Sequence, residues 1–103
     1  EIQRGDLVID FTRHEVRVRG NIVHLTPTEF KLLEVLIKEP GRAFRRLELL
    51  DRIFGYDFQG LERTVDVHVI NLRRKIEPDP KQPIYILTIY GIGYKFAEDC
   101  DAP

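Results

Sequence analysis

The first quarter of the chain alternates apolar and polar positions in the way that half-buried β-strands do. The alternation runs from Leu7 to Phe11 and returns from Val16 to Val18. Gly20-Asn21 then separates this run from the apolar residues of 22–25, and a two-residue turn with glycine first favours a type II′ hairpin. Residues 1–25 therefore predict a small antiparallel sheet with one apolar face.

A first helix is predicted to begin at Thr26, where three signals coincide. Thr26 is a good N-cap, Pro27 suits the first helical position, and Glu29 completes a capping box. The apolar face that follows has helical spacing and consists of Phe30, Leu33, Leu36 and Ile37. Pro40-Gly41 predicts the end of this helix.

Two more helices are predicted in the middle of the chain. The second runs from about Arg46 to Phe54 and ends at Gly55. Its inward side chains, by spacing, are Leu47, Leu50, Ile53 and Phe54. The third helix covers about Glu62 to Ile76. Its buried stripe has the spacing i, i+4, i+7 and i+11 and consists of Val65, Val69, Leu72 and Ile76.

The C-terminal part predicts a β-hairpin. Residues 77–83 hold three prolines, and residues 84–96 are rich in β-branched and aromatic side chains, with a tip at Tyr90-Gly91-Ile92-Gly93. Helices followed by a hairpin, in this order, are typical of a winged helix, whose third helix enters a DNA groove. The predicted fold class is α+β: a winged helix-turn-helix with an N-terminal antiparallel sheet, three helices and a C-terminal β-hairpin wing.

The face of the third helix opposite the buried stripe suits a DNA major groove. It carries Arg63, Val67, Ile70, Asn71 and Arg74, with Thr64 at its edge. Asn can pair bidentately with adenine, Arg with guanine, and Val or Ile methyl groups can contact the thymine methyl. An alternative stays open, because Val67 and Ile70 could pack on a protein partner, and cations near a helix C-terminus offset the macrodipole in any case.

Charge changes this picture only locally. The 103 residues carry a net charge of −1, which by itself does not indicate a polyanionic partner. Residues 42–75, however, hold eight Lys or Arg and five Asp or Glu, a local excess of +3. On charge alone, a solvated surface is the better interpretation of this excess.

Composition excludes several other classes of protein. The length suits one domain, and a single cysteine, Cys100, excludes a disulfide framework or a cysteine-based metal site. The apolar stretches are too short to span a bilayer, so no membrane partner is expected and the cytoplasm is the expected location. We expect residues 1–97 to form the domain and residues 98–103 to be a disordered tail.

Four motifs, in order along the chain, resemble the DNA-binding domain of the OmpR/PhoB family of response regulators. They are Leu25-Thr26-Pro27-Thr28-Glu29-Phe30-Lys31-Leu32-Leu33, Arg63-Thr64-Val65-Asp66-Val67-His68-Val69, Leu72-Arg73-Arg74-Lys75-Ile76 and Gly91-Ile92-Gly93-Tyr94-Lys95-Phe96. The likeness runs from about Leu7 to Phe96. The resemblance implies transcriptional control through a two-component system, with a phospho-acceptor receiver domain upstream. Because the chain opens at Glu1 without Met, we expect it to be a piece of a longer protein.

The resemblance also implies a set of DNA-facing residues. The expected set is Arg46, Arg63, Thr64, Val67, His68, Ile70, Asn71, Arg73, Arg74, Thr88 and Tyr90. Within it, Arg46, Arg63 and Arg73 are expected on phosphates, and His68 is expected at the flank of the helix. The loop of Tyr56, Asp57, Phe58 and Gln59 resembles the segment through which family members contact RNA polymerase, although its aromatic side chains could equally pack on the neighbouring helix.

Two positions depart from the family pattern. Many relatives carry an Arg that enters the minor groove where this chain has Tyr90, and a tyrosine cannot supply the same charge. Arg45 stands where relatives often have a Ser or Thr N-cap, so the second helix loses a cap while Arg45 and Arg46 become available to a phosphate.

The remaining chemistry does not indicate an enzyme, a cofactor or a metal. His14, His24 and His68 are far apart on different predicted elements, and Gly91-Ile92-Gly93 lacks the third glycine and the following helix of a dinucleotide site. The expected partner is double-stranded DNA with direct repeats, bound by two copies head to tail, whereas the isolated domain is expected to be a monomer. The alternative is a winged-helix module that binds protein.

Overall fold

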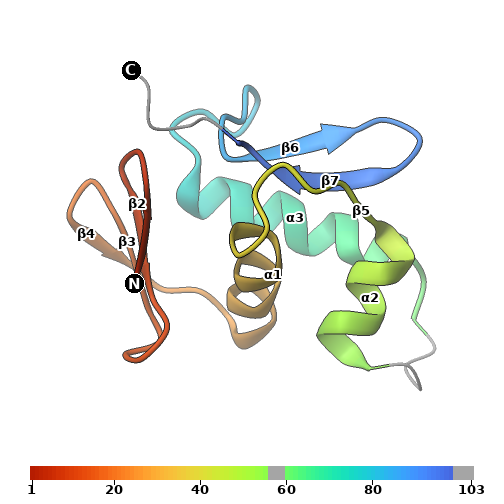
Figure 1. Ribbon diagram of the computed structural model, residues 1–103, viewed down its shortest axis with the longest axis horizontal. Helices are drawn as coiled ribbons and strands as arrows, with labels where there is room; N and C mark the ends of the chain where they lie inside the picture. Colours follow the sequence, from red (N-terminus) through yellow and green to blue (C-terminus); the bar gives the residue numbers. More distant parts are fainter. Residues whose placement is uncertain (56–59, 99–103) are drawn as a thin grey trace.

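The protein places a four-stranded sheet at one end, three helices in the middle and a β-hairpin along the third helix (Figure 1). The computed structural model describes residues 1–55 and 60–98. The predicted sequence of elements, and with it the winged helix-turn-helix fold class, is confirmed. One short strand, discussed below, was not predicted.

The N-terminal sheet is an antiparallel meander of β1 (Ile2–Arg4), β2 (Leu7–Asp10), β3 (Glu15–Val18) and β4 (Asn21–Val23). Val18 pairs with Asn21, so the turn consists of Arg19 and Gly20. Both have positive φ, 52° and 80°, which is typical of a type I′ turn. The predicted type II′ turn at Gly20-Asn21 is therefore wrong by one residue, because Arg19, a residue that rarely adopts positive φ, occupies the first turn position.

Helix α1 (Pro27–Ile37) begins as predicted. The Thr26 side chain accepts a hydrogen bond from the Glu29 backbone amide at 3.1 Å, and Glu29 Oε1 accepts one from the Thr26 amide at 3.0 Å. This reciprocal pair is a complete capping box. The predicted apolar face is fully buried, and Leu32 joins it.

Helix α2 (Arg46–Phe54) has its predicted bounds and ends at Gly55, whose φ is 94°. The prediction that Leu47 points inward is wrong, because its side chain is 53% exposed while Leu49 is fully buried. Phe44 and Arg45 form the strand that was not predicted, β5 (Phe44–Arg45), which pairs antiparallel with β7 (Gly93–Phe96). As predicted, the Arg45 side chain does not cap α2.

Helix α3 (Arg63–Ile76) lies across the middle of the molecule, with the hairpin of β6 (Ile86–Ile89) and β7 beside it (Figure 1). Its predicted stripe of four apolar residues is fully buried. The wing is part of a three-stranded sheet in which β7 is the middle strand, between β5 and β6. Strand β5 leaves no room for a side chain at position 93 of β7, because a Cβ added to Gly93 would lie 2.1 Å from the Phe44 carbonyl oxygen.

The three helices and both sheets share one apolar core. Its fully buried members include Leu7 and Ile9 from the first sheet, Leu36 from α1 and Phe96 from the wing. Among the described residues, no helix combines the length and the apolar character needed to cross a lipid bilayer.

Candidate nucleic-acid interface

The outer face of α3 is unusually apolar for a solvent-facing helix surface. Val67 is 54% exposed and Ile70 is 48% exposed, although both are large hydrophobic side chains. Arg63 and Arg74 are also exposed, and Asn71 is half-buried between them. Within the described ranges, neither arginine forms an ion pair with a carboxylate. The geometry thus brings together amide, guanidinium and methyl groups, which can contact the edges of base pairs.

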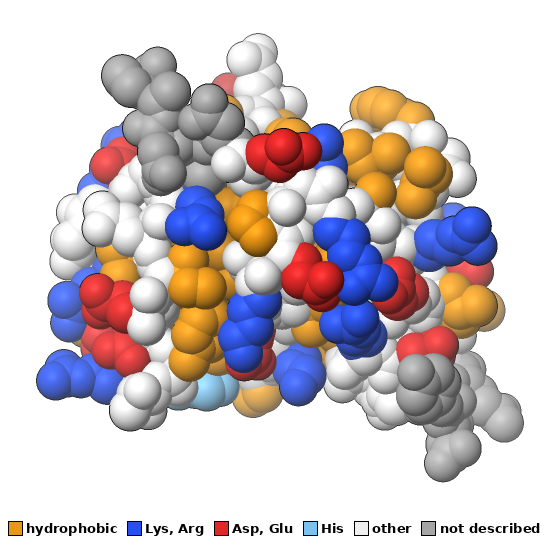
Figure 2. Space-filling model, in the orientation of Figure 1, with side chains coloured by type: hydrophobic (Ala, Val, Ile, Leu, Met, Phe, Trp, Pro, Cys, Tyr) orange, Lys and Arg blue, Asp and Glu red, His pale blue; other side chains and the backbone are white. Residues whose placement is uncertain are grey.

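The tip of the wing adds two more exposed hydrophobic side chains. Tyr90 is 92% exposed and Ile92 is 47% exposed, on either side of Gly91, whose φ of 80° makes the sharp turn. Apolar side chains gather at this end of the hairpin in the space-filling view (Figure 2). Among the described residues, nothing covers Tyr90, so its ring and hydroxyl group are available to a partner.

Arg73 ties α3 to the wing. Its Nη2 donates hydrogen bonds to the Ile86 carbonyl oxygen at 2.7 Å and to Thr88 Oγ1 at 2.8 Å, and its Nε donates to the same carbonyl at 3.1 Å. The guanidinium also lies 5.5 Å from the centre of the Tyr94 ring. Arg73 and Thr88, both predicted to face DNA, are thus bonded to each other in the free domain.

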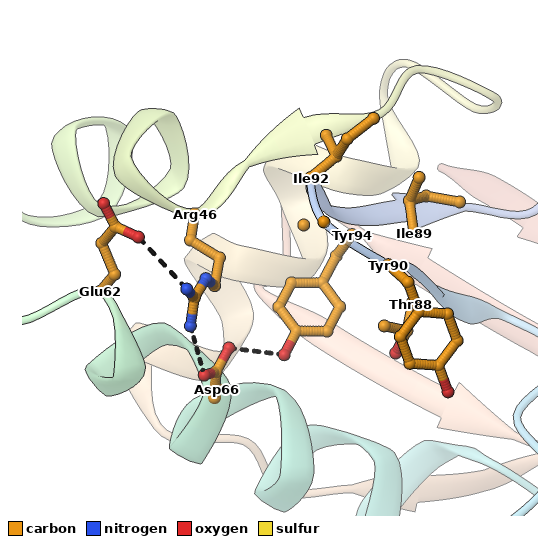
Figure 3. A pocket seen from close by; sticks show the side chains of 10 residues that line it. Arg46, Glu62, Asp66, Thr88, Ile89, Tyr90, Ile92 and Tyr94 are labelled. Atoms are coloured by element: carbon orange, nitrogen blue, oxygen red, sulfur yellow. Dashed lines mark hydrogen bonds and ion pairs between the residues drawn. The ribbon is translucent and has the colours of Figure 1, made fainter.

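Arg46 links α2 to α3 at the edge of α3 that faces α2. Figure 3 shows its guanidinium between two carboxylates, with Nη1 2.8 Å from Asp66 Oδ2 and Nη2 3.3 Å from Glu62 Oε2. The Tyr94 hydroxyl donates a hydrogen bond to the other oxygen of Asp66 at 2.6 Å. These groups line a pocket of about 310 Å³ between α3 and the wing.

The environment of Tyr94 also changes its acidity. Burial and then the hydrogen bond and negative charge of Asp66 raise the pKa of Tyr94 from 10.0 to about 12. The ionised form is disfavoured because a phenolate would face the Asp66 carboxylate in a poorly hydrated place. Tyr94 therefore stays a hydrogen-bond donor throughout the physiological range.

Two buried carboxylates hold α3 in place: Glu29, which was predicted only as part of the capping box, and Glu77, for which no role was predicted. Lys75 Nζ donates to Glu29 Oε1 at 2.6 Å, which joins α3 to α1. Burial alone would raise the pKa of Glu29, but hydrogen bonds from Lys75 and Thr26 outweigh it and lower that pKa. Glu77, at the C-terminus of α3, accepts backbone hydrogen bonds from Ile84, Tyr85 and Ile86.

Other predicted site residues lie at the flank of α3, as expected, or outside the described ranges. His68 is half-buried at the flank of α3, with its ring centre 6.0 Å from that of Phe54. The predicted polymerase-contact loop, Tyr56, Asp57, Phe58 and Gln59, lies outside the described residues. Within residues 1–55 and 60–98, no three His, Cys, Asp or Glu side chains lie close enough together to hold a metal ion.

The surface that carries α1 and α2 contrasts with the outer face of α3. Lys and Arg side chains there are interleaved with Asp and Glu (Figure 2). Arg42, for example, pairs with both Glu39 and Glu48, and Arg52 lies within 3.7 Å of the same two carboxylates. This surface is internally neutralised and offers little to a polyanion.

An exposed third helix with a hairpin at its side defines the class of winged-helix domains. Residues 20–96 match the family described as "Transcriptional regulatory protein, C terminal". The chain belongs to this family, which is one of transcription regulators rather than of enzymes.

Three relatives illustrate the match. The sensory transduction protein RegX3 of Mycobacterium leprae is 45% identical over 94 residues, which cover 91% of this chain and 48% of RegX3. The response regulator DrrB of Thermotoga maritima, an OmpR/PhoB homolog, is 36% identical with a TM-score of 0.86 over 93% of this chain and 43% of DrrB. The RstA DNA-binding domain of Klebsiella pneumoniae, solved in complex with the RstA box, is 33% identical with a TM-score of 0.84 over 93% of this chain and 95% of that domain.

The resemblance to the OmpR/PhoB family is therefore confirmed. The chain spans less than half the length of RegX3 and of DrrB.

Proposed function

We propose that this chain binds a specific sequence in double-stranded DNA and acts as the output domain of a two-component response regulator. Helix α3 would lie in the major groove and the wing beside the adjacent minor groove. The observation that carries the proposal is the outer face of α3, where Val67 and Ile70 remain exposed beside Arg63, Asn71 and Arg74. The RstA complex with its DNA box supports it by similarity of fold.

Selection of bound duplexes from a random pool tests this proposal directly, because it detects DNA binding and yields the preferred sequence together. We expect enrichment of one short motif, and we expect affinity to fall steeply with salt because Arg side chains displace counterions from phosphates. A pool that remains random after selection would contradict sequence-specific binding.

Asn71 is proposed to read a base. Asn71→Ala should change the preferred sequence at one base pair, at a cost of about 1–3 kcal/mol for the original base. Arg74→Ala on the same face is the matched comparison and should change a different position. Equal loss of affinity for every variant of the site would show that Asn71 positions the helix and reads no base.

The full-length protein is proposed to bind direct repeats in a head-to-tail pair, in the cytoplasm and under control of an upstream receiver domain. One short recognition helix reads too few base pairs to find a site in a genome. We expect this chain to be monomeric alone and to bind cooperatively when half-sites are one helical turn apart. Moving them by half a turn should abolish tight two-copy binding, and better binding to inverted repeats would overturn the head-to-tail arrangement.

A protein-binding role is the second candidate, and the exposed hydrophobic residues of α3 and of the wing tip are the observation that favours it. The two candidates differ in their response to Arg63→Ala. This change should weaken duplex binding and reduce its salt dependence, whereas an apolar protein contact would be little affected. RNA polymerase remains a proposed partner through residues 56–59.

A further inference from the structure

The edge of α3 that faces α2 carries more negative than positive charge. One guanidinium, that of Arg46, lies between the carboxylates of Asp66 and Glu62, and Figure 3 shows both contacts among the residues that line the pocket beside the wing. A phosphate that approached Arg46 here would meet an arginine already neutralised by the protein. The expected phosphate contact of Arg46 would therefore be strengthened if one of these carboxylates gave way.

The two carboxylates differ in how firmly they are held. Asp66 lies in the first turn of α3, accepts a short hydrogen bond from Tyr94 on its second oxygen, and has a 31% exposed side chain. Glu62 precedes the helix, lies at the longer distance of 3.3 Å from Arg46, and has a 49% exposed side chain. Its carboxylate forms no capping hydrogen bond with α3. Within the described part of the chain, Glu62 can therefore turn into solvent without breaking any contact between elements other than this ion pair.

We propose that Glu62 occupies the place of a DNA phosphate on Arg46 in the free domain, and that duplex binding exchanges this carboxylate for a phosphate. This inference rests on the proposed DNA binding. Phosphate and carboxylate oxygens both accept hydrogen bonds from a guanidinium, and Arg46 keeps its hydrogen bond to Asp66 during the exchange. Asp66 keeps its contact and holds the guanidinium in position. Glu62 thus lowers affinity for every duplex and carries no sequence information.

The test measures duplex affinity of Glu62→Gln by fluorescence anisotropy at fixed ionic strength, on the selected site and on a scrambled duplex. We expect binding about threefold to fivefold tighter on both, which corresponds to removing one exposed ion pair from the free state. Glu34→Gln is the matched control, because Glu34 pairs with Lys38 at 3.0 Å on α1 and its loss changes the net charge equally. Equal affinities for the two variants would overturn the proposal.

A double-mutant cycle identifies Arg46 as the group released. In an Arg46→Gln background, Glu62→Gln should bring no further gain beyond that of Glu34→Gln, since no guanidinium remains to be freed. A gain that persisted would show that Glu62 repels phosphates directly, and weaker binding of the single variant would show that Glu62 orients Arg46; either result overturns the exchange. Thermal melts check that all variants are folded.

The outcome separates this inference from the proposed function. A wild-type chain that bound no duplex would overturn both. A wild-type chain that bound its selected site, with Glu62→Gln no tighter than the control, would leave the proposed function intact and reject only the exchange at Arg46.

Discussion

The two flanks of α3 are fastened in different ways. On the wing flank (Arg73, Glu77 and the segment 84–88 that they bind), six of the seven hydrogen bonds that these two side chains form within the described residues end on backbone groups. These contacts join Arg73 to the Ile86 carbonyl oxygen and Glu77 to three successive amides. On the α2 flank (Arg46, Glu62, Asp66 and Tyr94), the ion pairs and the hydrogen bond that these side chains form with one another all join two side chains.

This difference separates fixed from exchangeable contacts. A backbone group cannot turn away, so the wing flank holds the hairpin at one position on α3 and loses much when a side chain is removed. The partly exposed side chains of Arg46 and Glu62 can exchange partners at little cost, so the α2 flank can adapt to an incoming anion. Comparing substitutions on the two flanks tests this interpretation.

The largest effect is expected at Glu77. Glu77→Ala should lower the free energy of unfolding by about 3 kcal/mol, because the buried amides of Tyr85 and Ile86 would lose their charged acceptor. Urea unfolding measures the loss, and Glu34→Ala, which removes a partly exposed carboxylate on α1, is the control. A loss below about 1 kcal/mol would show that the wing is held by packing alone.

Arg73 is expected to follow, with two separable roles. Arg73→Ala should cost about 2 kcal/mol of folding stability through the lost bonds to Ile86 and Thr88, and should reduce the salt slope of duplex binding by about one unit. Arg73→Lys keeps the charge but not the forked geometry. It should therefore restore the salt slope more than the stability, and full recovery of both would contradict the bidentate role.

Tyr94 tests the α2 flank. Tyr94→Phe should cost only about 1 kcal/mol at neutral pH, since Asp66 keeps its contact with Arg46. Because the pKa of Tyr94 is raised from 10.0 to about 12, its stabilising contribution is complete below pH 10 and is lost as the pH rises through 12. Unfolding at a series of alkaline pH values should show the wild-type advantage disappearing in that window; a constant difference would contradict the raised pKa.

The smallest effect on stability is expected at the wing tip. Tyr90→Ala should change the free energy of unfolding by less than about 0.5 kcal/mol, because the side chain is 92% exposed. Tyr90→Arg should tighten binding to all duplexes and increase the salt slope by up to about one unit, by placing a charge near the minor groove. Unchanged duplex binding in both variants would place Tyr90 outside the interface.

The sequence predicted those elements whose signals are local. The capping box at Thr26, the glycine after Phe54 and the stripe that begins at Val65 each lie within one element. The start of α1, both ends of α2 and both ends of α3 are confirmed within a residue, whereas α1 ends at Ile37, before the predicted stop at Pro40-Gly41. The outer face of α3 followed from the same periodicity, because exposed residues are those that the buried stripe leaves.

The missed features depend on residues that are distant in the chain. Strand β5 has only two residues and exists because β7 pairs with it some fifty residues later. Leu47 and Leu49 fit a nine-residue helix about equally well, and only the position of α2 on the core decides between them. The partners of Arg46 and Arg73 lie at least thirteen residues away along the chain, so residue type alone could not show that both side chains are engaged in the free domain.

Gly93 has a consequence for how this domain can diverge. The Phe44 carbonyl oxygen leaves no room for any side chain at position 93, whereas Tyr90 and Ile92 a few residues earlier are largely unconstrained by the fold. In a library of wing variants, survivors should therefore accumulate diversity at the tip and almost none at 93. Natural selection can therefore change the residues at the wing tip, and with them the wing's contacts, while Gly93 stays invariant.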